Sequence, residues 1–393
     1  MSVPAEIPDT GVMAPQELAE ARQYRRLRLA AAVSDIIVDL AFLAVVAFWL
    51  ARPIDEWLAR WSWMSRLASL RLAALLGIVG GLQLALSLPL AFYSDYVLEH
   101  RFHLSTLSLP GWLWRLVKQA LLGGVLGLAL VLGLYAIIWT TGAWWWLVAA
   151  AAFFAVSVLL GQLAPVLILP LFYSVKRLDQ PELLQRMRDL SQGTGLAIEG
   201  VYRLGLSEET VKGNAMLAGL GHTRRVLIGD TLLADFTLDE LSVIFAHEIG
   251  HHVFGHIRKM LLAGGLYSLL GLWLANLALS AWLAAPGGGL DYASFPVYAL
   301  PMLLLVLRVY WLLLEPLLNL VSRHYERQCD RYALRRTGLP AAYVSAFGKL
   351  SRLNKDDPDP PRLEVILFHS HPPIAQRIAM ADGTQTLDLG NGC

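Results

Sequence analysis

The sequence predicts a mainly α-helical membrane protein, in which a bundle of helices carries a small α/β domain. Hydrophobic residues make up 56% of the 393 residues and charged residues only 16%, compared with about 25% charged residues in soluble domains. Six stretches are long and apolar enough to cross a bilayer, and a polar segment with helix and strand signals separates the fourth from the fifth. Since 32 Lys and Arg nearly balance 31 Asp and Glu, the charge does not indicate a nucleic-acid partner.

These signals divide the chain into five parts. A polar tail (1–28) precedes four predicted spans (29–172), and an α/β segment (173–260) leads into a hairpin of two spans (261–320) and a polar carboxyl-terminal segment (321–393). The spans are expected near Leu29–Leu50, Leu72–Phe92, Leu121–Trp139, Trp144–Phe172, Leu261–Ala284 and Phe295–Leu320.

The distribution of basic residues predicts which side of the membrane each part faces. An even number of spans places both tails on one side, together with the α/β segment and the loop around Arg115. The short loops near Thr140 and Gly288 carry neither Lys nor Arg, and cytoplasmic loops tend to be the basic ones. We therefore expect a multi-pass protein with its tails and α/β segment in the cytoplasm, although three arginines within 52–66 favour the opposite orientation.

Several predicted spans contain ionisable side chains. Asp35 and Asp39 lie one turn apart in the first span, and Arg308 and Glu315 lie on one face of the last. Such groups usually face the interior of a bundle or water. Two interpretations stay open: a wet cavity within the bundle, or polar contacts that join helices at the membrane edge.

The α/β segment is expected to contain two helices and three short strands. Residues 177–195 form an amphipathic helical pattern that ends at glycine, and strand signals follow within 198–206, 213–221 and 224–230. The second helix is predicted over 237–260, where Thr and Glu three residues apart form a capping-box pattern ahead of an apolar stripe.

This second helix carries a metal-binding motif within "FAHEIGHHVFGH". His247 and His251 are four residues apart, so both rings project from one face of the helix and can bind one ion. Glu248 can reach a water on that ion, which is the arrangement of the H-E-x-x-H zinc signature. His252 and His256 point about a quarter turn away and no glutamate follows His252, so we interpret them as supporting or surface residues.

A catalytic zinc site uses three protein ligands and an open position, and Glu326 is the predicted third ligand. Two spans separate it from His251, so the chain returns to the side that it left. Asp330, one turn further on, is expected to accept the N–H of a ligating histidine. The alternative is that both carboxylates pair with neighbouring arginines on a solvated helix. Two histidines, a carboxylate and an open position suit one Zn²⁺ per chain.

Five stretches together resemble the type I integral-membrane CAAX prenyl proteases, which are zinc metallopeptidases of the gluzincin group. They are "FYSDYVLEHRFHLS", "GNAMLAGLG", "HEIGH", "NLVSRHYERQCDRYAL" and "HSHPPIAQRI". Two positions depart from the family pattern: Cys329 stands where alanine is usual, and His103 where glycine is common. The resemblance implies helices around a water-filled chamber that a zinc domain closes on the cytoplasmic side. Eukaryotic members have seven spans and six are predicted here, and we expect a bacterial member in the inner membrane (the endoplasmic reticulum membrane if eukaryotic).

The same resemblance implies roles for residues outside the metal motif. His371 is expected to steady the oxyanion, and Arg377 to bind a substrate carboxylate or brace the site. Asn214 and Ala215 lie in the segment that resembles the substrate-binding strand, and Asn319 belongs to the block that supports the third ligand. The alternatives are that His371 shapes a turn, that Arg377 is a surface charge and that Asn214 caps a turn.

The sequence therefore predicts a zinc endopeptidase whose Glu248 accepts a proton from the attacking water and passes it to the leaving amine. The substrate is expected to be a peptide or protein, either unmodified or carrying a lipid or associated with the membrane. Bilayer lipid is the other expected partner. One alternative is a quality-control metalloprotease that cuts misfolded membrane proteins. A metal transporter does not need Glu248, and an inactive scaffold does not need an intact set of ligands.

Overall fold

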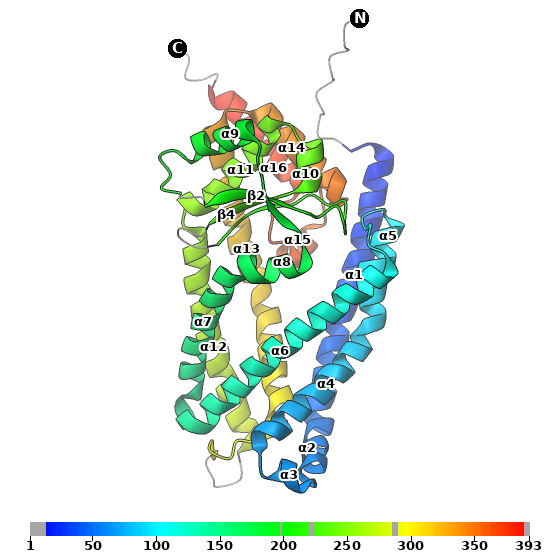
Figure 1. Cartoon of the computed structure of the whole chain (residues 1–393), viewed down its shortest axis with the longest axis vertical. Helices are drawn as coiled ribbons and strands as arrows, with labels where there is room; N and C mark the ends of the chain where they lie inside the picture. Colours follow the sequence, from blue (N-terminus) through cyan, green and yellow to red (C-terminus); the bar gives the residue numbers. More distant parts are fainter. Residues whose placement is uncertain (1–12, 197–198, 220–223, 285–289, 389–393) are drawn as a thin grey trace, which may run out of the picture.

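The computed structural model of the chain describes residues 13–196, 199–219, 224–284 and 290–388. It has two layers along its long axis: a bundle of long helices, and above it a small sheet surrounded by shorter helices (Figure 1). The predicted fold class, a mainly helical membrane bundle with a small α/β domain, is therefore confirmed.

The bundle consists of long helices joined by short helical turns. Its helices are α1 (Pro15–Val45), α2 (Ala51–Ala59), α3 (Ser62–Ser65), α4 (Ala68–Ala91), α5 (Glu99–Arg101), α6 (Leu109–Thr141), α7 (Trp145–Leu163), α8 (Leu169–Phe172), α12 (His256–Leu283) and α13 (Leu300–Thr337). The turns are η1 (Val46–Leu50), η2 (Phe92–Leu98), η3 (Gly142–Trp144), η4 (Ala164–Ile168) and η6 (Val297–Ala299).

Within the described residues, five helical stretches are long and apolar enough to cross a membrane. They are Pro15–Ala59, Ala68–Arg101, Leu109–Phe172, His256–Leu283 and Val297–Thr337. The third stretch turns back at Gly142, whose φ of 60° ends α6, so α6 and α7 are two separate legs (Figure 1). Each of the six predicted spans overlaps one of these stretches, and the last two predicted spans extend one or two residues beyond them.

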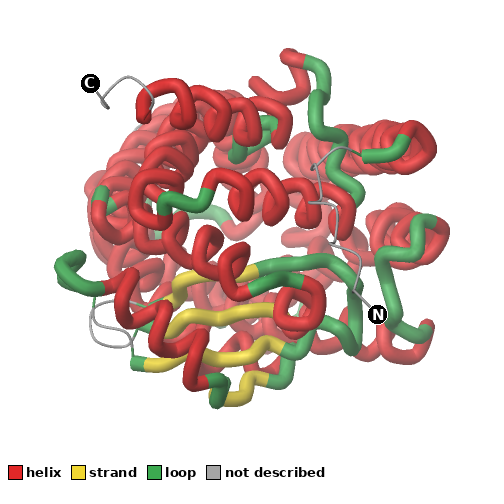
Figure 2. The backbone as a smooth tube through the Cα atoms, turned by 90° about the horizontal axis from the view of Figure 1, so that it is seen from above, coloured by secondary structure: helices red, strands yellow, loops and turns green. Residues whose placement is uncertain are grey.

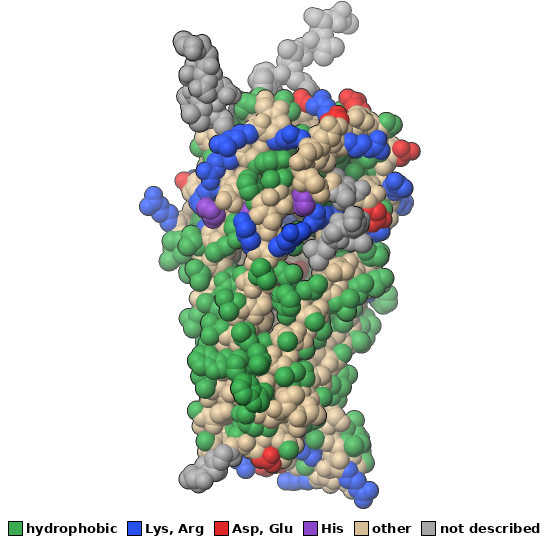
Figure 3. Space-filling model, turned by 90° about the vertical axis from the view of Figure 1, so that its left-hand side faces the viewer, with side chains coloured by type: hydrophobic (Ala, Val, Ile, Leu, Met, Phe, Trp, Pro, Cys, Tyr) green, Lys and Arg blue, Asp and Glu red, His purple; other side chains and the backbone are tan. Residues whose placement is uncertain are grey.

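Large apolar side chains point outward along the bundle. Leu262 is 69% exposed and Leu313 is 74% exposed. Hydrophobic side chains cover the middle of the molecule, whereas Lys and Arg gather around the upper domain and at the lower tip (Figure 3). Because soluble monomers rarely expose such a continuous apolar surface, this is the surface that lipid covers.

The bundle has its largest buried core at the end far from the sheet. Leu72, Tyr135 and Trp145 are fully buried there, and the indole of Trp145 donates a hydrogen bond to Asn276 at 2.7 Å. Asn276 therefore joins α7 to α12 by a polar contact between helices.

The upper domain is built on a mixed four-stranded sheet in the order β1-β2-β4-β3. Its strands are β1 (Val175–Arg177), β2 (Gly200–Leu204), β3 (Ala215–Ala218) and β4 (Arg225–Gly229). Only β2 and β4 are parallel, and β3 is an edge strand. Viewed from above, the strands lie side by side near one margin of the helices (Figure 2). Three strands match the sequence prediction, whereas β1 has too few residues to give a strand signal.

The upper domain also contains six shorter helices among the described residues. They are α9 (Pro181–Ser191), α10 (Asp230–Asp235), α11 (Leu238–Val253), α14 (Pro340–Asn354), α15 (Arg362–Phe368) and α16 (Ile374–Asp388). The start of α11 is the predicted capping box: Thr237 Oγ1 accepts from the backbone of Glu240, whose carboxylate accepts from the Thr237 N–H. The apolar stripe of α11 is buried in the core that includes β4. Each fully buried large side chain stabilises the fold by about 1.5–3 kcal/mol.

Two glycines decide how α11 meets its neighbours. Gly255 has a φ of 65°, so α11 ends at Val253, and α12 begins at His256 instead of continuing the same helix to residue 260 as predicted. A Cβ on Gly250 would lie 3.0–3.2 Å from Cys329, so the missing side chain lets α11 approach α13 closely. The expected segment limits at 260 and 320 fall inside α12 and α13, which run unbroken from the bundle into the upper domain.

Candidate active site and metal centre

Helix α11 presents His247 and Glu248 to a cleft, and His251 lies one turn further along the same helix. The cleft has a volume of about 430 Å³, and its lining includes Asn214, His247, Glu248, Glu326 and His371. The two histidine rings stand 5.2 Å apart at 67° to one another, one helical turn apart. The structure thus brings both predicted histidine ligands to the same space.

Helix α13 brings Glu326 to these rings. Its Oε2 atom lies 3.2 Å from His247 Nε2, and its Oε1 atom lies 3.2 Å from His251 Nε2. Neighbouring ligand atoms in a tetrahedral zinc site stand about 3.4 Å apart when the bonds are about 2.0–2.2 Å long. Glu326 is 4% exposed, yet its Oε2 atom accepts no hydrogen bond from the described residues. A buried carboxylate oxygen without a donor is costly, and a bound cation would satisfy it.

The far side of His247 is held by a buried ion pair. Its Nδ1 atom lies 2.9 Å from Asp330 Oδ1, and Arg377 donates two hydrogen bonds to the same carboxylate, from Nε at 2.9 Å and from Nη2 at 2.5 Å. The guanidinium also lies 3.9 Å from the centre of the Phe347 ring. Asp330 therefore keeps the Nδ1 proton of His247 in place and leaves Nε2 as the atom that can bind an ion.

The pKa of His247 reflects these contacts before any ion binds. Burial opposes the positive charge, but the adjacent carboxylates of Asp330 and Glu326 raise the pKa of His247 to about 9. A metal ion must therefore displace a proton from His247 at neutral pH, so its affinity depends on pH.

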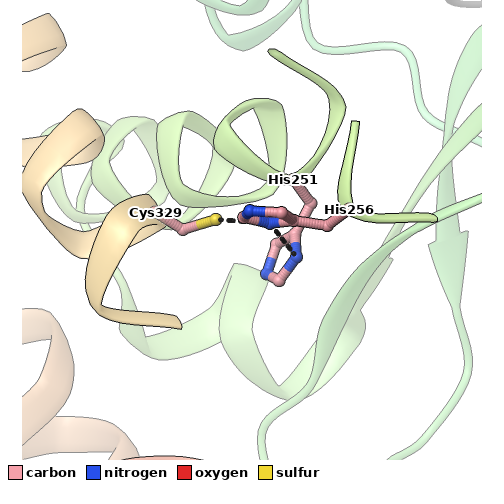
Figure 4. A group of neighbouring side chains, drawn as sticks. All are labelled: His251, His256 and Cys329. Atoms are coloured by element: carbon pink, nitrogen blue, oxygen red, sulfur yellow. Dashed lines mark hydrogen bonds between the residues drawn. The ribbon is translucent and has the colours of Figure 1, made fainter. Parts of the chain in front are cut away.

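His251 has a different partner, which the sequence did not assign. Its Nδ1 atom lies 3.3 Å from Nδ1 of His256 (Figure 4), and Nε2 of His256 lies 3.0 Å from the Oε1 atom of Gln328. Because Gln328 Oε1 only accepts, Nε2 of His256 carries the proton and its Nδ1 accepts from His251. The contact forms because α11 ends before Gly255, whose φ is 65°, and a new helix starts at His256; the sequence gives no separate signal for it.

Glu248 faces the edge strand β3. Its Oε2 atom accepts a hydrogen bond of 3.3 Å from the Leu217 N–H. The backbone of Asn214 points to β4, since its carbonyl accepts from the Gly229 N–H at 2.9 Å, and alternate residues of a strand point opposite ways. The backbone groups of Ala215 and Leu217 consequently face the cleft.

His371 and Arg377 differ in position. The His371 side chain is 62% exposed, and its Nε2 atom lies 3.6 Å from Glu326 Oε1. Partial enclosure by protein lowers the pKa of His371, so the ring is neutral at pH 7. Arg377 is 6% exposed and its donors are directed at Asp330, a geometry that suits a bracing role better than contact with a substrate carboxylate.

Two residues of α13 fix the segment that carries His371. Asn319 donates to the carbonyl of Leu367 at 2.8 Å, and Arg323 donates to the carbonyls of Val365 and His369 at 2.7 and 2.5 Å. Asn319 was expected to support the site, whereas Arg323 was considered only as one of the neighbouring arginines that could pair with Glu326 or Asp330. Its buried position could not be read from the sequence because the acceptors are backbone atoms more than forty residues away.

Comparison with known proteins gives matches over the whole chain. Residues 177–385 match a family described as "Peptidase family M48", and residues 1–174 match one described as "CAAX prenyl protease N-terminal, five membrane helices". The "Uncharacterized metalloprotease YhfN" of Bacillus subtilis is 28% identical, over 94% of this chain and 86% of its own.

Two eukaryotic proteins are also similar. "CAAX prenyl protease 1" of Saccharomyces cerevisiae is 27% identical over 78% of this chain and 71% of its own. The crystal structure of S. mikatae Ste24p superposes with a TM-score of 0.81 at 23% identity, over 97% of this chain and 92% of that one. The latter match shows a shared fold.

Proposed function

The chain belongs to peptidase family M48 and is a membrane-embedded metalloprotease, and on this premise we propose how its site works. The metal is zinc, one ion per chain, held by His247, His251 and Glu326. The observation that carries this assignment is the buried Oε2 atom of Glu326, which has no hydrogen-bond donor among the described residues and lies 3.2 Å from His247 Nε2.

When bound, zinc polarises the scissile carbonyl and makes a bound water more acidic. Glu248 accepts the proton of the attacking water and later donates it to the leaving amine. Its carboxylate lies on the cleft side of α11 and within hydrogen-bond distance of the β3 backbone, so it can shuttle a proton beside a peptide bound at that strand.

The substrate binds as an added strand along β3. The backbone groups of Ala215 and the carbonyl of Leu217, which lie on the side of β3 away from β4, supply hydrogen bonds that are indifferent to substrate side chains. Asn214 is exposed at the start of β3 and lines the cleft, where its amide holds the substrate main chain. The neutral His371 donates from Nε2 to the oxyanion, and Arg377 braces Asp330.

We propose that this site lies on the cytoplasmic side of a bacterial inner membrane. The sheet and the α11 motif belong to the same end as the arginine-rich start of α1, and the similarity to a Bacillus subtilis protein supports a bacterial source. Asp35 is exposed, and Arg308 Nε donates to Asp39 Oδ2 at 2.7 Å. Charged groups at membrane depth support a water-filled chamber between the helices.

The substrate class is a peptide or protein that is membrane-associated or lipidated. Several relatives are named CAAX prenyl protease 1, which supports this class. Cleavage of a prenylated peptide should be compared with cleavage of the same peptide without the lipid. A preference for the unmodified peptide, together with cleavage of unfolded membrane proteins, would favour the quality-control alternative.

The test of the proposed mechanism is a Glu248→Gln variant of the purified full chain. It should keep one zinc ion per chain and lose at least about 10²-fold in peptide cleavage, since general acid–base catalysis contributes about 10²–10⁴-fold. Asp239→Asn, which changes a carboxylate on the outer face of α11 that is 47% exposed, is the matched control and should cleave normally. Retained cleavage in Glu248→Gln would refute the role of Glu248.

A further inference from the structure

A second group of metal-binding side chains lies directly behind the active site. Cys329 of α13, His256 at the start of α12 and His251 of α11 point toward one another (Figure 4), and one ligand atom from each lies within 4.8 Å of the others. Cys329 and His256 are fully buried, at 0% exposure. The peptidase mechanism makes no use of the Cys329 thiol.

The two distances from His256 to the other members of this group match those of a tetrahedral site. His256 Nδ1 lies 3.3 Å from His251 Nδ1 and 3.6 Å from Cys329 Sγ. For bond lengths of about 2.0–2.1 Å to nitrogen and 2.3 Å to sulfur, tetrahedral ligands stand about 3.4 Å (N to N) and about 3.6 Å (N to S) apart.

The His256 ring is already oriented for binding an ion. Its Nε2 proton is directed at Gln328 Oε1, 3.0 Å away, which leaves the lone pair of Nδ1 facing His251 and Cys329. The ring also stacks on Tyr325 with centroids 4.1 Å apart and planes at 12°. Fixing one ligand ring in advance reduces the entropy lost when an ion binds.

We propose that His251, His256 and Cys329 form a second metal site for a thiophilic divalent ion, such as Cd²⁺, Co²⁺ or excess Zn²⁺. The ion replaces two protons, one from the thiol and one shared between the two Nδ1 atoms. Its fourth position is open to water. Entry is from the cavity of about 570 Å³ that His251, Phe254 and Gly255 line.

Occupation of this site inhibits the peptidase. The catalytic ion binds His251 through Nε2, which lies 3.2 Å from Glu326, whereas the second ion binds Nδ1 of the same ring. In the hydrogen-bonded state the two Nδ1 atoms point at each other, but around an ion their lone pairs must converge at about the tetrahedral angle. The His251 ring therefore turns, and its Nε2 atom moves out of line with the catalytic ion, which stays bound through His247 and Glu326 but in a distorted geometry.

Cobalt binding to the purified full chain tests the site. The protein should carry Cys393→Ser, because Cys393 is the second of the two cysteines in the sequence. The ligand set at Glu326 contains no sulfur, so a thiolate-to-cobalt charge-transfer band in the near ultraviolet reports the second site alone. We expect two Co²⁺ per chain and this band, and in Cys329→Ala one Co²⁺ per chain and no band. The proposal would be overturned if the Cys393→Ser protein, which keeps Cys329, bound one ion and showed no band, or if Cys329→Ala showed the same band.

Excess Zn²⁺ or Cd²⁺ tests the inhibition. Peptide cleavage by the Cys329 protein should fall at least tenfold as the second ion binds, and Cys329→Ala should resist the same excess while keeping its basal cleavage and one zinc ion, which shows that it is folded. Equal inhibition of both proteins would contradict the inhibitory role. His256→Gln is a second variant that should lose the band.

The cobalt test does not depend on the proposed peptidase mechanism. The band can be measured in Glu248→Gln, which is expected to be inactive but to hold metal. If the protein that keeps Cys329 shows no band but cleaves peptide normally, only the second metal site is rejected. If Glu248→Gln cleaves peptide normally, only the proposed peptidase mechanism is rejected.

Discussion

At the scale of single residues, the site depends on the side chains that contact the Nδ1 atoms of the two ligating histidines and so orient their rings. Asp330 holds Nδ1 of His247 and His256 lies 3.3 Å from Nδ1 of His251, so both Nε2 atoms face Glu326. The motif alone predicts that two histidines share a face. It does not predict which nitrogen is free, because that is decided by side chains that arrive from α12, α13 and α16.

Asp330→Asn should weaken metal binding. The asparagine can still accept one hydrogen bond from His247, but it gives up the charge that stabilises the ligating ring and leaves the buried Arg377 without its counter-ion. Outer partners of ligating histidines typically contribute about 10–100-fold in metal affinity. Competition with a chelator of known affinity measures this, with Asp239→Asn as the surface control. Unchanged affinity would show that Asp330 does not support the ligand.

His371→Ala should lower kcat and leave zinc content and KM nearly unchanged. The donor acts on charge that develops only in the transition state, and removal of such a donor costs about 10²–10³-fold in kcat. Gln376→Ala, an exposed change near the start of α16, is the control for disturbance of the segment. A rise in KM with kcat preserved would instead assign His371 to substrate binding.

At the scale of elements, helix periodicity was predictable and helix ends were not. The apolar stripe and capping box of α11 are local features, so the sequence indicates both. The end of α11 depends on the positive φ of Gly255, and nothing in "HHVFGHIRKM" separates such a glycine from one inside a helix. Likewise β1, with three residues, is a strand only because β2 pairs with it.

The capping glutamate of α11 should make stability depend on pH. Glu240 is 3% exposed, and although burial opposes its charge, hydrogen bonds from Ser345, Lys349 and the Thr237 backbone lower its pKa in the folded state. A carboxyl whose folded pKa is lowered adds stability above its unfolded pKa of about 4.3 and loses it as the pH falls below that value.

At pH 7, Glu240→Gln should therefore have a free energy of unfolding about 1.5–3 kcal/mol lower than that of the wild type, because it loses hydrogen bonds to a charged group. The difference should shrink as the pH falls below about 4.3. Thermal unfolding in detergent at pH 7 and at pH 4 measures it. A difference that does not change with pH would show that the charge of Glu240 contributes nothing.

At the scale of the whole molecule, two long helices carry the site across the boundary between bundle and domain. Helix α13 spans Leu300 to Thr337 and bears both Arg308 in the bundle and Glu326 at the cleft. The presence of long apolar spans was predictable. So was the meeting of Glu326 with the α11 motif, since a hairpin of two spans returns the chain to its starting side. The residues that face the inside of the bundle could not be predicted, because the sequence of one span does not show how that span packs against the others.

The orientation of the molecule can be tested with single cysteines in a chain that has Cys329→Ala and Cys393→Ser. Thr140→Cys lies at the exposed turn between α6 and α7, and Glu182→Cys lies on exposed α9 in the upper domain. In intact bacterial cells a membrane-impermeant thiol reagent should label Thr140→Cys and reach Glu182→Cys only after the cells are opened. The reverse pattern would place the active site outside the cytoplasm.

The measurement that tests the central claim most directly is diffraction at the zinc absorption edge from crystals of the purified chain. One anomalous peak is expected within about 2.0–2.2 Å of His247 Nε2, His251 Nε2 and a Glu326 oxygen. A peak at other ligands, or one bound by the histidines with Glu326 turned away, would contradict the account.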